Sequence, residues 1–267
     1  SASCTGSGLD QFQSVSDWHM ADLLTDGQRW AKIGIRLRSN SELADAWKTA
    51  RGGAYRFPFR ITMDKWEDEH PSIDNQRFYG FQKLFLTNIA DDSSMLRHQV
   101  SSAVYRSKGV PAYRSTLVKL RIAHGQGVND TADVGIYSLR EMIDGPMLKR
   151  WFSGSDGNLY EPKSLLGANY STADFGGGDN ADKTYADVKA FMNALHGANR
   201  TTDVNAWRDA LRKAFDVDGF VNWLAISTVL GDRDGYGNEE DNYALYADQG
   251  KLRWMALDLD NTVPTGN

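Results

Sequence analysis

The chain has 267 residues, which is enough for one large domain or two lobes. A hydrophobic content of 41% and eight tryptophans can supply a core, and the net charge of −5 lacks the basic signature of nucleic-acid binding. No run of 18 apolar residues is present, so we expect no membrane-spanning helix.

Residues 1–28 are polar and rich in Ser, Gly and Asp, and we predict that they form an N-terminal extension. The single cysteine, Cys4, excludes an intrachain disulfide and a multi-cysteine zinc site. We expect Cys4 to be an idle residue near a frayed terminus. Two alternatives stay open, because Ala2-Ser3-Cys4 resembles the end of a bacterial lipoprotein signal and Ser1-Ala2-Ser3 is equally compatible with a cloning remnant.

Alternating apolar and polar residues predict strands in the first half of the chain. The predicted strands are Ala31–Arg38, Tyr55–Met63, Phe81–Asn88, Ser115–Ala123 and Val134–Leu139. A short helix is expected over Glu42–Ala50. A longer helix is expected around Leu96–Val104, with the residues of Asp91–Ser94 as caps and with Gly109 and Pro111 ending it.

The second half of the chain is predicted to be mainly helical. The expected helices are Gly145–Phe152, Tyr185–Leu195, Asp203–Phe215 and Asp218–Leu230, with a long loop over Ser153–Asp182 and a hairpin formed by Tyr243–Tyr246 and Leu252–Leu257. We therefore predict an α+β chain with a strand-rich N-lobe at about 29–141, a helix-rich C-lobe at about 142–267 and a cleft between them.

Three polar residues flank the predicted hairpin: Asp234, Asn242 eight residues later, and Asp258 sixteen residues after that. Phosphoryl transfer from ATP uses an acid that orients a hydroxyl, together with an amide oxygen and a carboxylate that hold Mg²⁺. The alternative is a set of solvated turn residues, because Asp and Asn favour turns. The apolar Met255–Leu257 favours the metal hypothesis, since it would fix Asp258 at the end of a buried strand.

Two other motifs overlap this region. Asp232-x-Asp234-x-x-Gly237 resembles the start of an EF-hand loop, but its twelfth position is Tyr243 where a bidentate Glu is needed. Asp258-Leu259-Asp260-Asn261-Thr262 matches the Asp-x-Asp-x-Thr signature of haloacid-dehalogenase-type phosphatases. Those enzymes carry the signature on their first strand, whereas here only five residues follow it, so we do not favour the phosphatase hypothesis.

Other candidate residues lie on the predicted strands of the first half. Glu141 follows the last strand, where an acid could accept hydrogen bonds from adenine or ribose; a solvent-facing acid is the alternative. Arg60 interrupts an apolar pattern and Lys83 precedes an apolar strand, so both are candidates for phosphate contact, ahead of Arg36, Lys119 and Arg121. The five histidines lack metal-site spacing and support neither a zinc site nor a Ser–His–Asp triad.

Several segments, in this order, resemble the CotH family of atypical protein kinases. The resemblance runs from about Ile33 to Pro264 and rests on Ile35–Ser41, Phe57–Ile61, Phe78–Leu84, Asp92–Arg97, Gly109–Ala112, Gly135–Tyr137, Gly157–Tyr160 and Asp241–Tyr243. Each segment alone is a weak signal, whereas their order over more than 200 residues is specific.

The resemblance implies a two-lobed kinase-like fold that binds ATP and Mg²⁺ (or Mn²⁺) and phosphorylates Ser or Thr on a protein substrate. Asp234 matches the catalytic acid, and Asn242 and Asp258 match the metal-binding residues, with Asp260 as a further metal-site acid. Glu141 matches an acid in the segment that connects the lobes. The residues at 29–267 would then be the kinase-like domain, with Arg60 or Lys83 neutralising phosphate charge.

The chain departs from the family pattern at two places. Ser39-Asn40-Ser41-Glu42 replaces a commoner Gly-Asn-Ser-Ser, and His98 stands where relatives often carry Glu. The alternative hypothesis is therefore a catalytically weak or inactive nucleotide-binding or surface-interaction module. The resemblance also implies an extracytoplasmic location, secreted or on a bacterial cell or spore surface.

Overall fold

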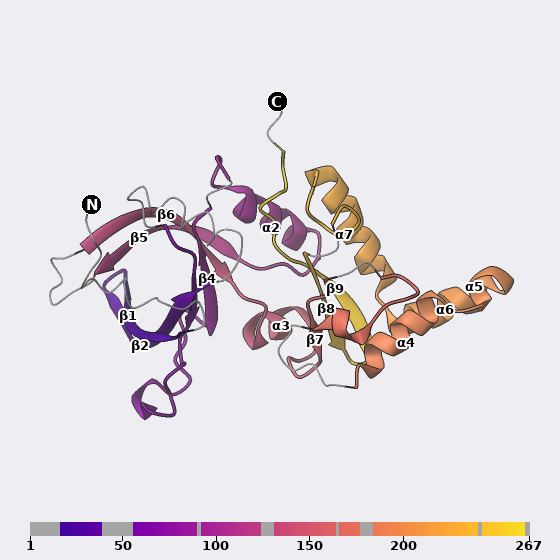
Figure 1. Ribbon diagram of the computed structural model, residues 1–267, viewed down its shortest axis with the longest axis horizontal. Helices are drawn as coiled ribbons and strands as arrows, with labels where there is room; N and C mark the ends of the chain where they lie inside the picture. Colours follow the sequence, from indigo (N-terminus) through magenta and orange to yellow (C-terminus); the bar gives the residue numbers. More distant parts are fainter. Residues whose placement is uncertain are drawn as a thin grey trace. The chain divides into compact units, whose positions relative to one another are not determined.

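A computed structural model describes residues 17–38, 56–89, 92–123, 131–163, 166–176, 184–239 and 242–264. These residues form two compact units (Figure 1). The first unit contains the described residues up to Met95 together with Ser115–Met142. The second contains Leu96–Arg114 and the described residues from Ile143 onward. The helix expected over Glu42–Ala50 lies outside the described residues.

The first unit is built on a curled antiparallel sheet of six strands (Figure 1). The strand order is β1-β2-β3-β4-β6-β5. The strands are β1 His19–Thr25, β2 Gln28–Leu37, β3 Phe59–Thr62, β4 Lys83–Thr87, β5 Ser115–Ala123 and β6 Thr131–Glu141, and a short 3₁₀ helix, η2, covers Pro71–Ile73. The five strands predicted from alternation in this half are confirmed, with ends that differ by a few residues.

Strand β1 was not predicted, because His19–Thr25 fell within the supposed polar extension. These residues alternate between partly buried and exposed side chains, and they pair antiparallel with β2. The connection is Asp26-Gly27, whose φ angles are 50° and 75°. An Asp-Gly pair with two positive φ values makes the tight turn that suits a two-residue hairpin. The dipeptide was therefore the sequence signal that could have predicted β1.

One face of the curled sheet carries the core of the first unit. Its buried members include Ile33 and Leu37 on β2, Phe59 and Ile61 on β3, and Leu84 on β4. Ile35 pairs with Ile61, and Ile61 pairs with Leu84, so apolar side chains meet across neighbouring strands. Because successive side chains of a strand point to opposite faces of the sheet, the intervening residues, including Arg36 and Arg60, lie on the other face.

Gly34 is packed too closely for any side chain. A Cβ there would lie 2.5 Å from Lys65 Cβ and 3.1 Å from Trp18 Cε3. We expect Gly34→Ala to lower the free energy of unfolding by about 1–3 kcal/mol, because overpacking forces neighbouring groups to shift. Urea unfolding measures this, with Gly176→Ala as control, since a Cβ at Gly176 would be in ordinary contact at 3.6 Å. An unchanged midpoint for Gly34→Ala would contradict the packing seen around Trp18.

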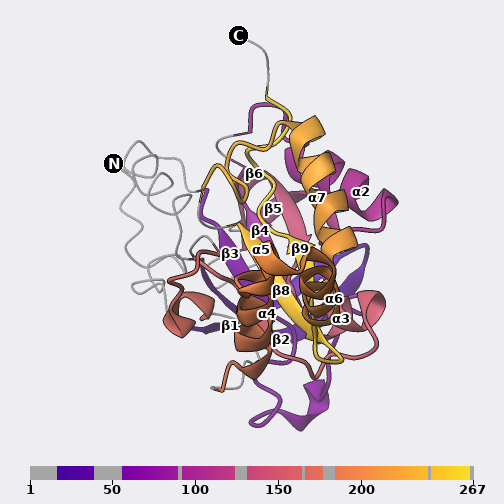
Figure 2. The same ribbon diagram turned by 90° about the vertical axis from the view of Figure 1, so that its right-hand side faces the viewer.

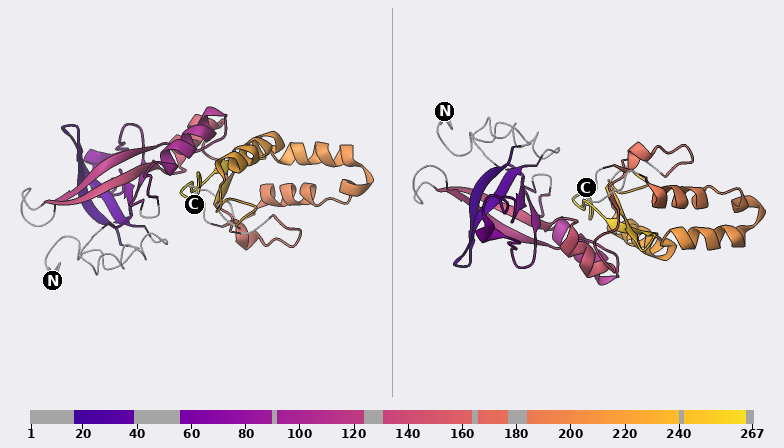
Figure 3. Two further views of the ribbon diagram at one scale, coloured as in Figure 1. Left: turned by 90° about the horizontal axis from the view of Figure 1, so that it is seen from above. Right: turned by 90° about the horizontal axis from the view of Figure 1, so that it is seen from below.

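The second unit combines helices with a three-stranded antiparallel sheet in the order β7-β8-β9. The helices are α2 Arg97–Ser107, α3 Gly145–Trp151, α4 Ala186–Leu195, α5 Asn199–Thr202, α6 Val204–Ala214 and α7 Val217–Leu230, and the strands are β7 Leu159–Tyr160, β8 Tyr243–Asp248 and β9 Lys251–Ala256. Helices α4 and α6 lie side by side, joined through α5 (Figure 3). Helix α2 lies beside α7 (Figure 2).

The predicted helices and hairpin of this half are confirmed within a few residues. The long loop expected over Ser153–Asp182 instead contains β7 and a 3₁₀ helix, η3 Thr172–Phe175. Strand β7 is only two residues long, which is too short for an alternation pattern to reveal. Within the described residues, no helix has the length and apolar character needed to span a membrane.

An aromatic cluster fixes the β8–β9 hairpin in the second unit. Trp254 on β9 stacks on Tyr243 of β8 with ring centroids 4.4 Å apart and an interplanar angle of 3°. Trp223 and Phe220 of α7 contact the same indole at 4.9 and 4.8 Å. These rings are mostly buried, and such clusters contribute strongly to core stability. The polar residues just before β8 and just after β9 are therefore held by a rigid element.

Candidate metal centre

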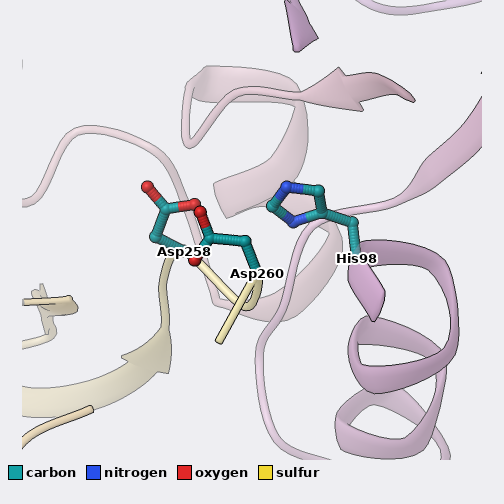
Figure 4. A group of neighbouring side chains, drawn as sticks. All are labelled: His98, Asp258 and Asp260. Atoms are coloured by element: carbon teal, nitrogen blue, oxygen red, sulfur yellow. The ribbon is translucent and has the colours of Figure 1, made fainter. Parts of the chain in front are cut away.

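Three side chains of the kinds that ligate metals meet in the second unit and form a candidate metal site: His98, Asp258 and Asp260 (Figure 4). Each offers one ligand atom, and these atoms all lie within 4.8 Å of one another. His98 belongs to the first turn of α2 and is only 2% exposed, whereas the two aspartates follow β9 and are partly buried. The cluster therefore joins two segments that are about 160 residues apart in the chain.

The loop after β9 is fastened to α2 by hydrogen bonds. The Thr262 hydroxyl donates to the Leu259 carbonyl at 2.7 Å and lies 2.6 Å from the Ser101 hydroxyl. Arg97 Nη1 donates to the Asp260 carbonyl at 3.2 Å. Thr262 and Ser101 are fully buried, so the threonine of the phosphatase-like signature has a structural role here. Asp258 itself has a φ of 40°, a left-handed conformation that costs energy outside glycine.

The beginning of α2 differs from the prediction. Asp92 and Ser94 were expected to cap the helix, but the N-cap residue is Leu96, which makes no side-chain capping bond. The Asp92 carboxylate instead accepts hydrogen bonds from the Ser94 amide at 3.0 Å and from the Ser94 hydroxyl at 2.6 Å. The local turn thus satisfies the polar groups that the sequence suggested for the helix end.

Tyr113 links the His98 ring to the aspartate loop. Its hydroxyl lies 2.7 Å from His98 Nδ1, and the same oxygen accepts the Leu259 amide at 3.2 Å. Tyr113 and Leu259 are both buried. The orientation of the imidazole is therefore tied directly to the residue between Asp258 and Asp260.

Asp234 and Asn242, predicted from their spacing, are in direct contact. Asn242 Nδ2 donates to the Asp234 carboxylate at 2.7 Å and to the Asp234 carbonyl at 3.0 Å. Asn261 Nδ2 donates to the same carboxylate at 3.1 Å and lies 3.3 Å from Asp260 Oδ1. Asn261 therefore connects the Asp234–Asn242 pair to the candidate metal site, a role that its position in the sequence did not indicate.

The Asp234 loop begins where α7 ends at Gly231, which has a φ of 60°. Such a left-handed glycine is a common helix terminator. Asp232 follows, 7% exposed, and its carboxylate accepts the Asp234 amide at 3.3 Å. Burial of this carboxylate, with the charge of Asp234 nearby, raises the pKa of Asp232. Asp232 thus shapes the turn from inside the fold, which does not fit an exposed EF-hand ligand.

The raised pKa of Asp232 predicts a pH-dependent stability. Folded Asp232 holds its proton at pH values where the unfolded side chain, with its ordinary value of 3.8, has lost it. Its contribution to the free energy of unfolding is therefore greatest below the unfolded value and declines as the pH rises through the folded pKa. On lowering the pH from 7 towards 4, we expect the wild type to gain stability relative to Asp232→Asn. Urea unfolding across this range measures the difference, and parallel pH profiles would contradict the expectation.

The residues predicted to contact nucleotide all lie in the first unit. Arg60 on β3 pairs with Arg36 of β2 on one side and Phe85 of β4 on the other, with its guanidinium 5.9 Å from the centre of the Trp18 ring. Lys83 begins β4. Glu141 ends β6, pairs with Leu84 and is buried. Their contact with nucleotide stays a prediction.

Residues 51–266, most of the chain, match the family model described as CotH kinase protein. The chain belongs to the CotH family. The resemblance inferred from the ordered segments is confirmed. Invasin CotH7 of Rhizopus delemar, a curated relative, is 24% identical over 194 residues, which cover 66% of this chain and 30% of the relative. The chain thus spans less than a third of that relative's length.

The donor set in this CotH-family chain fits a divalent cation. Two carboxylates and one imidazole converge within 4.8 Å. Asn261 connects them to Asp234, which also accepts a hydrogen bond from Asn242. Carboxylate oxygens suit Mg²⁺ and Mn²⁺, and an imidazole is a frequent ligand of transition ions. In the sequence, His98 is visible only as a departure from the family pattern, since no short spacing connects it to either aspartate.

Proposed function

We propose that this chain is an ATP- and divalent-metal-dependent protein kinase that transfers the γ-phosphate to a Ser or Thr hydroxyl. The observation that carries the proposal is the hydrogen-bonded series Asn242–Asp234–Asn261–Asp260, which ends beside Asp258. It brings a candidate catalytic acid next to a metal-ligating cluster, as phosphoryl transfer needs. Membership of the CotH family supports the proposal. A two-lobed kinase-like fold, with a strand-rich N-lobe and a helix-rich C-lobe, is part of it.

Asp234 would orient the acceptor hydroxyl and take its proton late in the transfer. Two side-chain amides, Asn242 at 2.7 Å and Asn261 at 3.1 Å, donate to the same oxygen, Oδ2. Both bonds fix the orientation of the carboxylate. Oδ1, the other carboxylate oxygen, is then the atom that would accept the hydroxyl.

Asn242, Asp258 and Asp260 would hold the metal that binds the ATP phosphates. Because Asn242 uses Nδ2 towards Asp234, its Oδ1 is the atom suited to a cation. The metal, when bound, neutralises charge that develops on the phosphates during transfer. The protein's own contribution is to hold the two carboxylates close together despite their mutual repulsion, through the loop that Thr262 and Ser101 fasten to α2.

A second candidate function is a nucleotide-binding or surface-interaction module without catalysis. It is favoured by one observation, which is that the relative in Rhizopus delemar bears the name invasin. Under either function we propose an extracytoplasmic location, because it was implied by the family resemblance.

The two functions differ in one assay. The chain is incubated with ATP labelled at the γ-phosphate and with Mg²⁺ or Mn²⁺, with and without a generic protein acceptor. A kinase is expected to label itself or the acceptor on Ser or Thr, and the labelling should stop when EDTA removes the metal. Nucleotide-dependent thermal stabilisation without any labelled product would instead support the binding module and contradict the kinase proposal.

A further inference from the structure

We propose that His98 is a direct ligand of the metal at the Asp258–Asp260 cluster and makes the site select a transition ion such as Mn²⁺ over Mg²⁺. The inference rests on the proposed function for the presence of a metal, and it adds the class of metal. It is carried by the position of His98, whose ring faces the two carboxylates from α2 (Figure 4).

The dimensions of the cluster suit a single ion. Two ligands of one ion, each bonded at about 2.1 Å, can be at most about 4.2 Å apart. The three ligand atoms already lie within 4.8 Å of one another, so a contraction of about 0.6 Å brings every pair within this limit.

The surroundings of His98 match those of a metal-ligating histidine. Such a histidine donates the N–H of its other ring nitrogen to a neighbour that fixes the tautomer. Nδ1 of His98 lies 2.7 Å from the Tyr113 hydroxyl oxygen, which also accepts the Leu259 amide at 3.2 Å. A hydroxyl oxygen has two lone pairs and can accept both hydrogens. With the proton on Nδ1, Nε2 carries the lone pair that binds a metal.

The nitrogen ligand determines the preference among cations. Mg²⁺ takes oxygen ligands and gives up its waters reluctantly, whereas transition ions accept imidazole readily. Mn²⁺ suits this mixture well, because it also accepts carboxylate and phosphate oxygens. Two carboxylates and a neutral imidazole balance a divalent charge, which lowers the cost of holding the ion beside the buried His98.

The competing explanation is that His98 is a protonated counter-cation of the two aspartates. In that arrangement Nε2 would carry a hydrogen and could not bind a metal. Removing the positive ring would then strengthen cation binding at the carboxylates. The two explanations therefore predict opposite effects of removing the ring on the affinity of the site for a cation. They also differ in whether nitrogen is bonded to the ion.

Electron paramagnetic resonance on the full chain with Mn²⁺, in the absence of nucleotide, tests the inference. Loss of the free Mn²⁺ signal gives the dissociation constant, and competition with Mg²⁺ gives the selectivity. Electron spin-echo modulation of the bound ion then detects ¹⁴N coupling if imidazole is a ligand. We expect nitrogen coupling in the wild type, a measurement that needs no variant to fold.

Variants assign the signal to His98. We expect His98→Glu, which offers oxygen in place of nitrogen, to lose the coupling and to lower the Mn²⁺-over-Mg²⁺ preference by about tenfold or more. Tyr113→Phe should keep the coupling but weaken Mn²⁺ binding by about tenfold. His196→Gln is the matched control, because His196 Nε2 contacts the Leu166 carbonyl 3.0 Å away and takes no part in the cluster.

The outcomes separate this inference from the proposed function. Bound Mn²⁺ without nitrogen coupling, or a His98→Glu variant with unchanged or stronger Mn²⁺ preference, would overturn the inference and leave the metal-dependent kinase standing. A wild type that binds neither Mn²⁺ nor Mg²⁺, with or without ATP, would overturn both. Nitrogen coupling that His98→Glu removes and His196→Gln keeps supports the assignment.

Discussion

Replacing Asp258 with asparagine is expected to lower metal-dependent phosphate transfer by about 100-fold or more. The substitution keeps the size of the side chain but removes one of the two carboxylate charges in the cluster. Removing a single preorganised electrostatic group from an active site typically costs 10²–10³ in kcat. We expect the loss to arise from weaker metal binding, so high Mn²⁺ concentrations should recover part of the activity.

The measurement is steady-state labelling with γ-phosphate over a range of metal concentrations. Asp209→Asn is the matched control, because it makes the same change on the exposed surface of α6 in the same unit. We expect this control to retain wild-type activity. If Asp258→Asn retains wild-type transfer at low metal concentration, the proposed metal site is wrong.

Replacing Asp234 with asparagine is expected to lower kcat by about 10²–10⁴, the usual contribution of general acid–base catalysis. Asn242 and Asn261 both donate to this side chain, and an amide oxygen at position 234 could still accept one of them. The folded loop should therefore persist while the proton acceptor is lost. Unlike Asp258→Asn, this variant should bind Mn²⁺ with nearly unchanged affinity.

Mn²⁺ titration and labelling of the same Asp234→Asn preparation separate binding from catalysis. A loss of both would mean that Asp234 holds the metal rather than the acceptor hydroxyl. Activity equal to that of the wild type would remove Asp234 from the mechanism. Only intact metal binding with a low kcat agrees with the proposed role.

Elements with a clear hydrophobic period were predictable from the sequence. Strands β2 to β6 alternate along one apolar face, and α7 shows a run of apolar residues that ends at Gly231. Strands β1 and β7 were not predicted, because features other than a hydrophobic period identify them. Strand β1 is recognised by its turn, Asp26-Gly27, and by its pairing with β2. Strand β7 is stabilised by pairing with β8, a contact between residues more than 80 positions apart.

The candidate site was partly predictable from the spacing of its residues in the sequence. Asp234, Asn242 and Asp258 lie near a hairpin whose ends bring them close, so their spacing carries information. The structure joins Asp234 to Asn242 directly and reaches Asp260 through Asn261. His98 comes from a helix about 160 residues earlier in the chain, and only tertiary packing of α2 places it beside Asp258 and Asp260. No local pattern could have shown that contact.

The chain passes between its two units three times, because Leu96–Arg114 belongs to the second unit while the strands on either side belong to the first. A fragment that starts at Ile143 would lack His98, Ser101 and Tyr113, which hold the Asp258–Thr262 loop. No single cut therefore yields an intact second unit. Truncation at Ile143 is expected to leave the second unit with an incomplete core, so the two units need to be expressed as one chain.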